Sequence, residues 1–103
     1  MRKLLGLAAT LVAITPAVAE ADAEASTTSL ARCIVHYESR GNPNAVNGMY
    51  HGIAQWSPEA WRRHGGRRYS RDPLFASYGQ QWRVLVGALR RFGCRDWCPF
   101  DPC

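Results

Sequence analysis

The sequence predicts a small, mainly helical domain with a minor β-hairpin, an α+β fold held together by disulfides. Apolar residues recur at helical spacing over 28–39 and 78–92, and a tight-turn pair lies between these two segments. Four cysteines follow residue 30. A domain this small buries a modest fraction of its surface, so covalent cross-links are expected to stabilise it.

The N-terminus has the pattern of an export signal over 1–19. Two basic residues precede an apolar run over 4–14, and Ala19 ends a small-x-small cleavage pattern, with Ala23 as a second possible site. The run is short for a membrane span, although an uncleaved anchor is the alternative. We therefore predict a secreted or cell-wall protein without stable membrane insertion.

Residues 20–29 are acidic, small and polar, and are interpreted as a spacer before a single domain over 30–103. The first helix of that domain is predicted over 28–39, where an apolar stripe includes Cys33 and Ile34, and Gly41 ends it.

Two further helices have clear start signals. Ser57 and Pro58 are suited to the N-cap and first position of a short helix over 58–64. Ser77 and Gln80 match a capping box at the start of a helix over 78–92, and Gly93 follows its end.

The segment between the first two helices favours a small hairpin. Asn47 and Gly48 form a strong tight-turn signal, flanked by short extended segments at 45–46 and 49–54.

The cysteine count is even, and an exported chain meets an oxidising compartment. Four cysteines allow three pairings, of which we favour Cys33 with the C-terminal cluster and the remaining two paired locally. Zinc binding is disfavoured because the C-x3-C-x4-C spacing lacks a C-x2-C half-site. The four cysteines are Cys33, Cys94, Cys98 and Cys103.

The chain is basic, with 13 Lys and Arg against 8 Asp and Glu. Beyond residue 26, eleven arginines face five acidic residues, a net charge of +6. Such a charge suits an anionic partner such as a cell wall, although solubility alone would also explain it. Nucleic acid is not expected for an exported chain, and neither a metal nor a cofactor is expected.

Glu38 is the candidate catalytic residue. It falls about 40° from Ile34 on the helical wheel, beside the apolar stripe and near the C-terminal end of the helix. Partial burial and the negative helix end both disfavour its charged form. A carboxylic acid that stays protonated near neutral pH is what glycosidic cleavage needs. The alternative is a solvated glutamate or one paired with an arginine.

The surrounding strings strengthen the catalytic interpretation. YESRGNPNAVNG over 37–48, YHGIAQWSPEAW over 50–61 and ASYGQQWRVLVGAL over 76–89 resemble the lysozyme-like transglycosylase domains. The resemblance is closest to the resuscitation-promoting-factor type and its actinobacterial relatives, and it extends over residues 30–103. It implies a lysozyme-like fold and a peptidoglycan glycan strand as partner.

The resemblance also implies roles for individual residues. Glu38 corresponds to the catalytic acid of the family. The expected substrate-binding residues are Asn47, Tyr50, Gln55, Trp61 and Gln81, although Trp61 at helical spacing also fits a core position. The chain departs from the family in the position of Cys33 relative to Glu38, in His51 and in its three-cysteine tail.

The type of cleavage depends on whether a second carboxylate faces Glu38. The remaining acidic residues of the domain offer no obvious partner, so a single-acid mechanism on the MurNAc-GlcNAc β-1,4 bond is predicted. By resemblance, the product is an anhydro-muropeptide from a monomeric lytic transglycosylase. The alternatives are a hydrolytic muramidase and a non-catalytic glycan-binding module; a membrane-active peptide is disfavoured. The four acidic residues of the domain other than Glu38 are Glu59, Asp72, Asp96 and Asp101.

Overall fold

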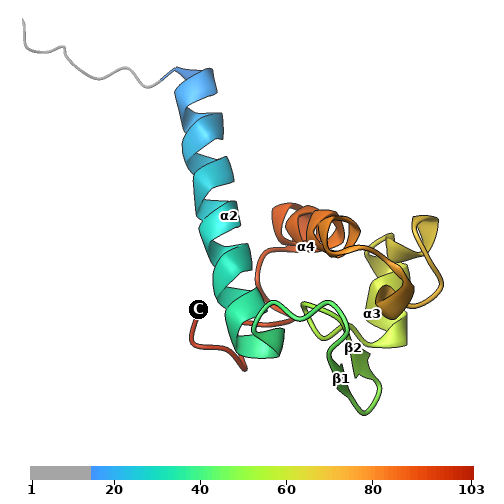
Figure 1. Ribbon diagram of the computed structural model, residues 1–103. Helices are drawn as coiled ribbons and strands as arrows, with labels where there is room; N and C mark the ends of the chain where they lie inside the picture. Colours follow the sequence, from blue (N-terminus) through green and yellow to red (C-terminus); the bar gives the residue numbers. More distant parts are fainter. Residues whose placement is uncertain (1–14) are drawn as a thin grey trace, which may run out of the picture.

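A computed structural model describes residues 15–103, so the predicted export signal over 1–19 lies mostly outside the described residues. The domain is mainly helical with one two-stranded antiparallel hairpin, as the sequence predicts (Figure 1). Its elements are α2 (Pro16–Ser39), β1 (Val46–Asn47), β2 (Tyr50–His51), α3 (Pro58–Arg63), η1 (Gly66–Arg68), η2 (Pro73–Phe75) and α4 (Tyr78–Phe92).

Helix α2 ends at Ser39 as predicted but begins at Pro16, twelve residues before the expected start. The Thr15 side chain caps the helix by accepting a hydrogen bond from the Val18 N–H, and Pro16 occupies the first turn. The following alanine-rich stretch has high helix propensity, which explains the extension. Residues 15–26 are exposed, and this half of α2 projects away from the domain in Figure 1.

The hairpin and α4 form where the sequence places them. Asn47 pairs with Tyr50 across the hairpin, and Gly48 in the turn has a φ of 62°. Helix α4 has the expected bounds, and its capping box between Ser77 and Gln80 is present.

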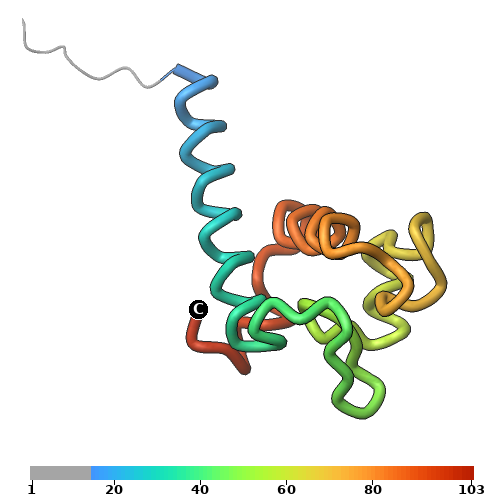
Figure 2. Tube along the Cα trace, viewed as in Figure 1, coloured from blue at the N-terminus to red at the C-terminus, as the bar shows by residue number. Residues whose placement is uncertain are grey.

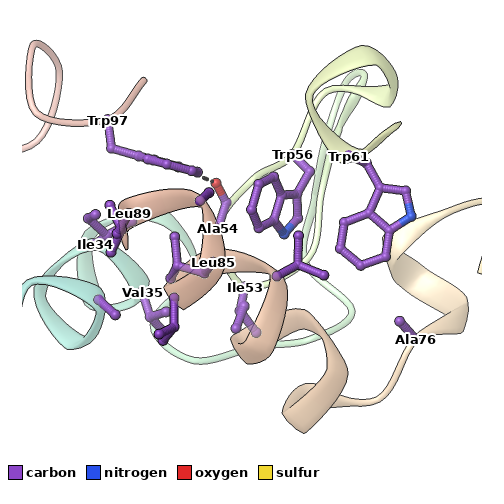
Figure 3. Packing of buried hydrophobic residues seen from close by; sticks show 14 residues of the cluster. Ile34, Val35, Ile53, Ala54, Trp56, Trp61, Ala76, Leu85, Leu89 and Trp97 are labelled. Atoms are coloured by element: carbon purple, nitrogen blue, oxygen red, sulfur yellow. Dashed lines mark hydrogen bonds between the residues drawn. The ribbon is translucent and has the colours of Figure 1, made fainter. Parts of the chain in front are cut away.

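The core lies where α2 packs on α4 and both meet the turn after the hairpin. Figure 3 shows the rings of Trp56 and Trp61 beside each other in this core. The largest fully buried side chains are Trp56, Trp61, Ile34, Ile53, Leu85, Gln81 and Val84.

Two disulfides close the C-terminal tail. Cys33 of α2 pairs with Cys103, 70 residues away, and Cys94 pairs with Cys98. The expected pairing of Cys33 with the C-terminal cluster is confirmed. The disulfide brings the end of the chain back to the last turns of α2, as the trace in Figure 2 shows. Within residues 15–103, none of the helices has the length and apolar character to cross a membrane.

Candidate active site

The Glu38 side chain lines a pocket of about 330 Å³ at the C-terminal end of α2. The hairpin and the turn after it form one wall of the pocket, and the cysteine-bound tail forms the other. The other residues that line it are Asn47, Tyr50, Gln55, Asp96, Trp97 and Phe100.

Ser39, the residue after Glu38, fixes the end of α2 against the turn after the hairpin. Its hydroxyl donates to the Ile53 carbonyl at 2.7 Å and accepts from the Gly41 N–H at 3.1 Å. Ile53 is fully buried, so this contact joins the helix end to the core. The Glu-Ser pair of the sequence therefore combines a pocket carboxyl with the side chain that positions it.

Gln55, in the pocket wall formed by the turn after the hairpin, has an unusual backbone conformation. Its φ of 52° lies in the left-handed region, which costs a non-glycine residue roughly 1–2 kcal/mol. Its side-chain amide donates to the Gly52 carbonyl at 3.0 Å. Backbone strain of this kind is often found where a side chain has a functional role.

The tail wall is anchored at both ends. Trp97 is buried, and its indole N–H donates to the Ala54 carbonyl at 2.9 Å (Figure 3). The Asp101 N–H donates to the Trp97 carbonyl at 2.9 Å, and Cys103 is bonded to α2. Asp101 is thus held between two fixed points beside the helix that carries Glu38.

Glu38 has a strongly perturbed acidity. Burial, a hydrogen bond with Asp101 and the like charge of Asp101, in that order, raise the pKa of Glu38 from 4.5 to about 8. Two carboxyl groups form a hydrogen bond only when one carries a proton. No arginine or histidine of the described chain lines the pocket to favour the ionised form. Glu38 is therefore a carboxylic acid at neutral pH, as expected from its position.

Asp101 is the site residue that the sequence reasoning did not identify. Its Oδ2 atom is buried and receives no hydrogen bond from a donor within residues 15–103. The cysteine spacing contains the signal: Cys33 precedes Glu38 by five residues, and Asp101 precedes Cys103 by two. Once Cys33 is paired with Cys103 rather than with another cysteine, the two carboxyls are brought close together.

A comparison with protein families shows which family the chain belongs to. The model of the transglycosylase-like domain matches residues 21–99, which is most of the chain. The chain belongs to the transglycosylase-like domain family. Membership indicates glycan-cleaving activity on a glycan substrate. Among curated proteins and solved structures, none is similar enough to count as a match.

Two residues expected to bind substrate in this transglycosylase-like domain lie in its interior, which corrects the expectation. Trp61 is fully buried, and its indole N–H donates to the Ser70 carbonyl at 2.9 Å. Gln81 is also fully buried, accepting from the Ile53 N–H at 2.7 Å and donating to the Pro73 carbonyl at 3.0 Å. Neither side chain can reach a sugar, because both serve internal packing and backbone hydrogen bonding.

The Glu38 pocket of the transglycosylase-like domain continues into a second hollow of about 230 Å³. The two share Tyr50, Gln55, Asp96, Trp97 and Phe100, and the second extends toward α3. The Phe100 side chain is 81% exposed and that of Tyr50 is 46% exposed, so two aromatic rings are open to solvent at the pocket.

Proposed function

We propose that this chain is an exported lytic transglycosylase that cleaves the MurNAc-GlcNAc β-1,4 bond of peptidoglycan. The observation that carries the proposal is that Glu38 is kept protonated in an open pocket with aromatic and amide walls. The resemblance to the resuscitation-promoting-factor type supports the peptidoglycan substrate. The signal-like segment over 1–19 and the two disulfides support export.

In the proposed first step, Glu38 donates its proton to the glycosidic oxygen, and the bond between that oxygen and the sugar C1 breaks. The carbonyl oxygen of the neighbouring N-acetyl group forms a bond to C1, which replaces a protein nucleophile. In the second step, the 6-hydroxyl oxygen attacks C1 and the bond between C1 and the acetyl oxygen breaks, while Glu38 takes up the hydroxyl proton. The products are an anhydro sugar end and a regenerated, protonated Glu38.

Asp101 assists both steps through its contact with Glu38. Before cleavage, it favours the protonated form of Glu38. After proton donation, two negative carboxylates lie side by side, which makes Glu38 a stronger base toward the 6-hydroxyl. Asp101 is therefore proposed as a positioning residue that acts through Glu38.

The position of Asp101 also excludes it as the second carboxylate of a hydrolytic mechanism. Retaining glycosidases hold their carboxyls about 5–5.5 Å apart across the sugar, and inverting enzymes hold them farther apart. A carboxyl in hydrogen-bonding contact with Glu38 is on the same side of the substrate as the acid. Asp101 therefore cannot act as the opposing nucleophile or base.

The open walls of the pocket suit a sugar chain. Aromatic faces such as those of Tyr50 and Phe100 stack on the apolar faces of sugar rings. The amides of Asn47 and Gln55 are suited to hydrogen bonds with hydroxyl or N-acetyl groups.

Product analysis tests the proposal. The protein and its Glu38→Gln variant are incubated with purified peptidoglycan, followed by turbidity clearing and mass spectrometry of the fragments. Anhydro ends from the parent protein and their loss in the variant are the expected results. Reducing ends carrying added water would instead identify a hydrolytic muramidase. Binding without turnover by both proteins would identify a glycan-binding module.

A further inference from the structure

A second groove, rich in arginine, lies between α4 and the projecting half of α2. It has a volume of about 660 Å³ and is lined by four arginines together with Trp82 and Tyr69. It shares none of its lining residues with the Glu38 pocket. The four arginines are Arg68, Arg83, Arg90 and Arg91.

The groove has an excess of positive charge. Glu24 is the one acidic residue that lines it, and its Oε1 accepts from the Arg90 Nε at 3.0 Å. The other three arginines have no carboxylate partner among residues 15–103, which leaves a net charge of +3 in the lining. Unpaired guanidinium groups around one hollow favour bidentate binding of phosphate or carboxylate groups.

Gly87 is a second, independent observation at the same place. It lies within α4, where a glycine costs roughly 0.5–1 kcal/mol relative to alanine. A Cβ atom at this position would meet nothing within 4 Å, so internal packing does not explain the glycine. Gly87 lines both this groove and an adjoining hollow of about 50 Å³, and its missing side chain opens the space between the arginines.

The spacing of the arginines suits an extended ligand. Arg83 and Arg91, two of the arginines without a carboxylate partner, are eight residues apart on α4, roughly 12 Å along the helix axis. A chain with repeated oxyanions can present one group to each of these guanidinium groups.

We propose that this arginine groove binds a linear polyanion whose phosphate or carboxylate groups repeat along the chain. Such a ligand would hold the protein on an anionic polymer of the wall while the Glu38 pocket acts on glycan. Binding in the groove does not depend on the chemistry at Glu38.

Fluorescence anisotropy with labelled inorganic polyphosphate and labelled poly-L-glutamate tests the proposal. Arg83→Gln/Arg91→Gln should weaken binding by about tenfold or more. The matched control Arg62→Gln/Arg71→Gln removes the same charge from exposed positions outside the groove and should change binding less than about twofold.

Gly87 provides a test that leaves the charge unchanged. Gly87→Leu fills the groove and should weaken binding as strongly as the arginine pair. Gly87→Ala adds only a methyl group into open space, so it should retain binding and raise the melting temperature. Both should retain cleavage of soluble glycan fragments, which separates this proposal from the one concerning Glu38.

The two probes identify the ligand chemistry. Tight binding of polyphosphate alone, poly-L-glutamate alone or both supports the groove and assigns the oxyanion. Failure of the parent protein to bind either polymer overturns the proposal. An equal loss of polymer binding in the groove double variant and the control double variant also overturns it. So does full polymer binding by a Gly87→Leu protein that has a native circular dichroism spectrum.

Discussion

Replacing Asp101 with asparagine tests how the tail controls the acidity of Glu38. The substitution removes the like charge and introduces an amide that can donate a hydrogen bond to the ionised Glu38. Both changes favour the charged form, so the pKa of Glu38 falls from about 8. Burial is the largest cause of the raised pKa and remains, so the value stays above 4.5.

The size of the effect follows from the titration of one group. Loss of a like charge in direct contact is expected to lower the pKa by about one unit or more. At pH 8, Glu38 would then be protonated in about one tenth of the molecules instead of about half. The rate at pH 8 should therefore fall about fivefold, whereas the rate near pH 5.5 should change little because Glu38 is protonated in both proteins.

The assay is the pH dependence of kcat on purified peptidoglycan between pH 5 and 9. The alkaline limb of the Asp101→Asn profile should lie at lower pH than that of the parent protein. Glu59→Gln is the control, because it removes one negative charge from a side chain that is 73% exposed and outside the pocket. An unchanged alkaline limb, or an equal loss of rate at every pH, would refute the proposed role of Asp101.

Three further predictions concern stability. Glu38→Gln should stabilise the fold at pH 8, because a carboxyl with a raised folded-state pKa contributes stability below pH 4.5 that is lost as the pH rises through about 8. Solvent screening of this half-buried group limits the gain to about 1–2 kcal/mol, and melting curves at pH 4.5 and 8 should show it only at the higher pH. Cys33→Ser/Cys103→Ser should cost about 4 kcal/mol in urea unfolding, because the disulfide closes a 70-residue loop. Gly52→Ala should unfold at a lower urea concentration than the parent protein, because the added Cβ would lie 2.2 Å from the Gln81 Oε1 and the φ of residue 52 is +87°. An unchanged unfolding midpoint would contradict this prediction.

Local signals in the sequence were sufficient for most of the secondary structure. The capping residues at Ser77 and Gln80 and the stripe that follows predicted both ends of α4, because capping and helical periodicity depend on neighbours within a few positions. The start of α2 was misplaced. Its early turns carry no buried stripe, and alanine propensity with the cap at Thr15 forms the helix there.

The site was only partly predictable, because short-range patterns place a residue on a helix face but not in a pocket. Glu38 could be placed on the flank of an apolar stripe, and Asn47, Tyr50 and Gln55 do line the pocket with it. Trp61 has the residue type expected of a sugar-binding platform, but whether such a ring faces the core or a groove depends on contacts with distant segments.

By itself, the sequence determined α3, α4, the hairpin and the acid at the end of the first helix, because each depends on short-range spacing. Tertiary structure decided that Gln81 is internal and that Cys103 is the partner of Cys33, which places Asp101 against Glu38. It also decided that four arginines surround one hollow at Gly87. Those arrangements depend on how α2, α4 and the disulfide-bonded tail pack, and a pattern of neighbouring residues contains no information about such long-range contacts.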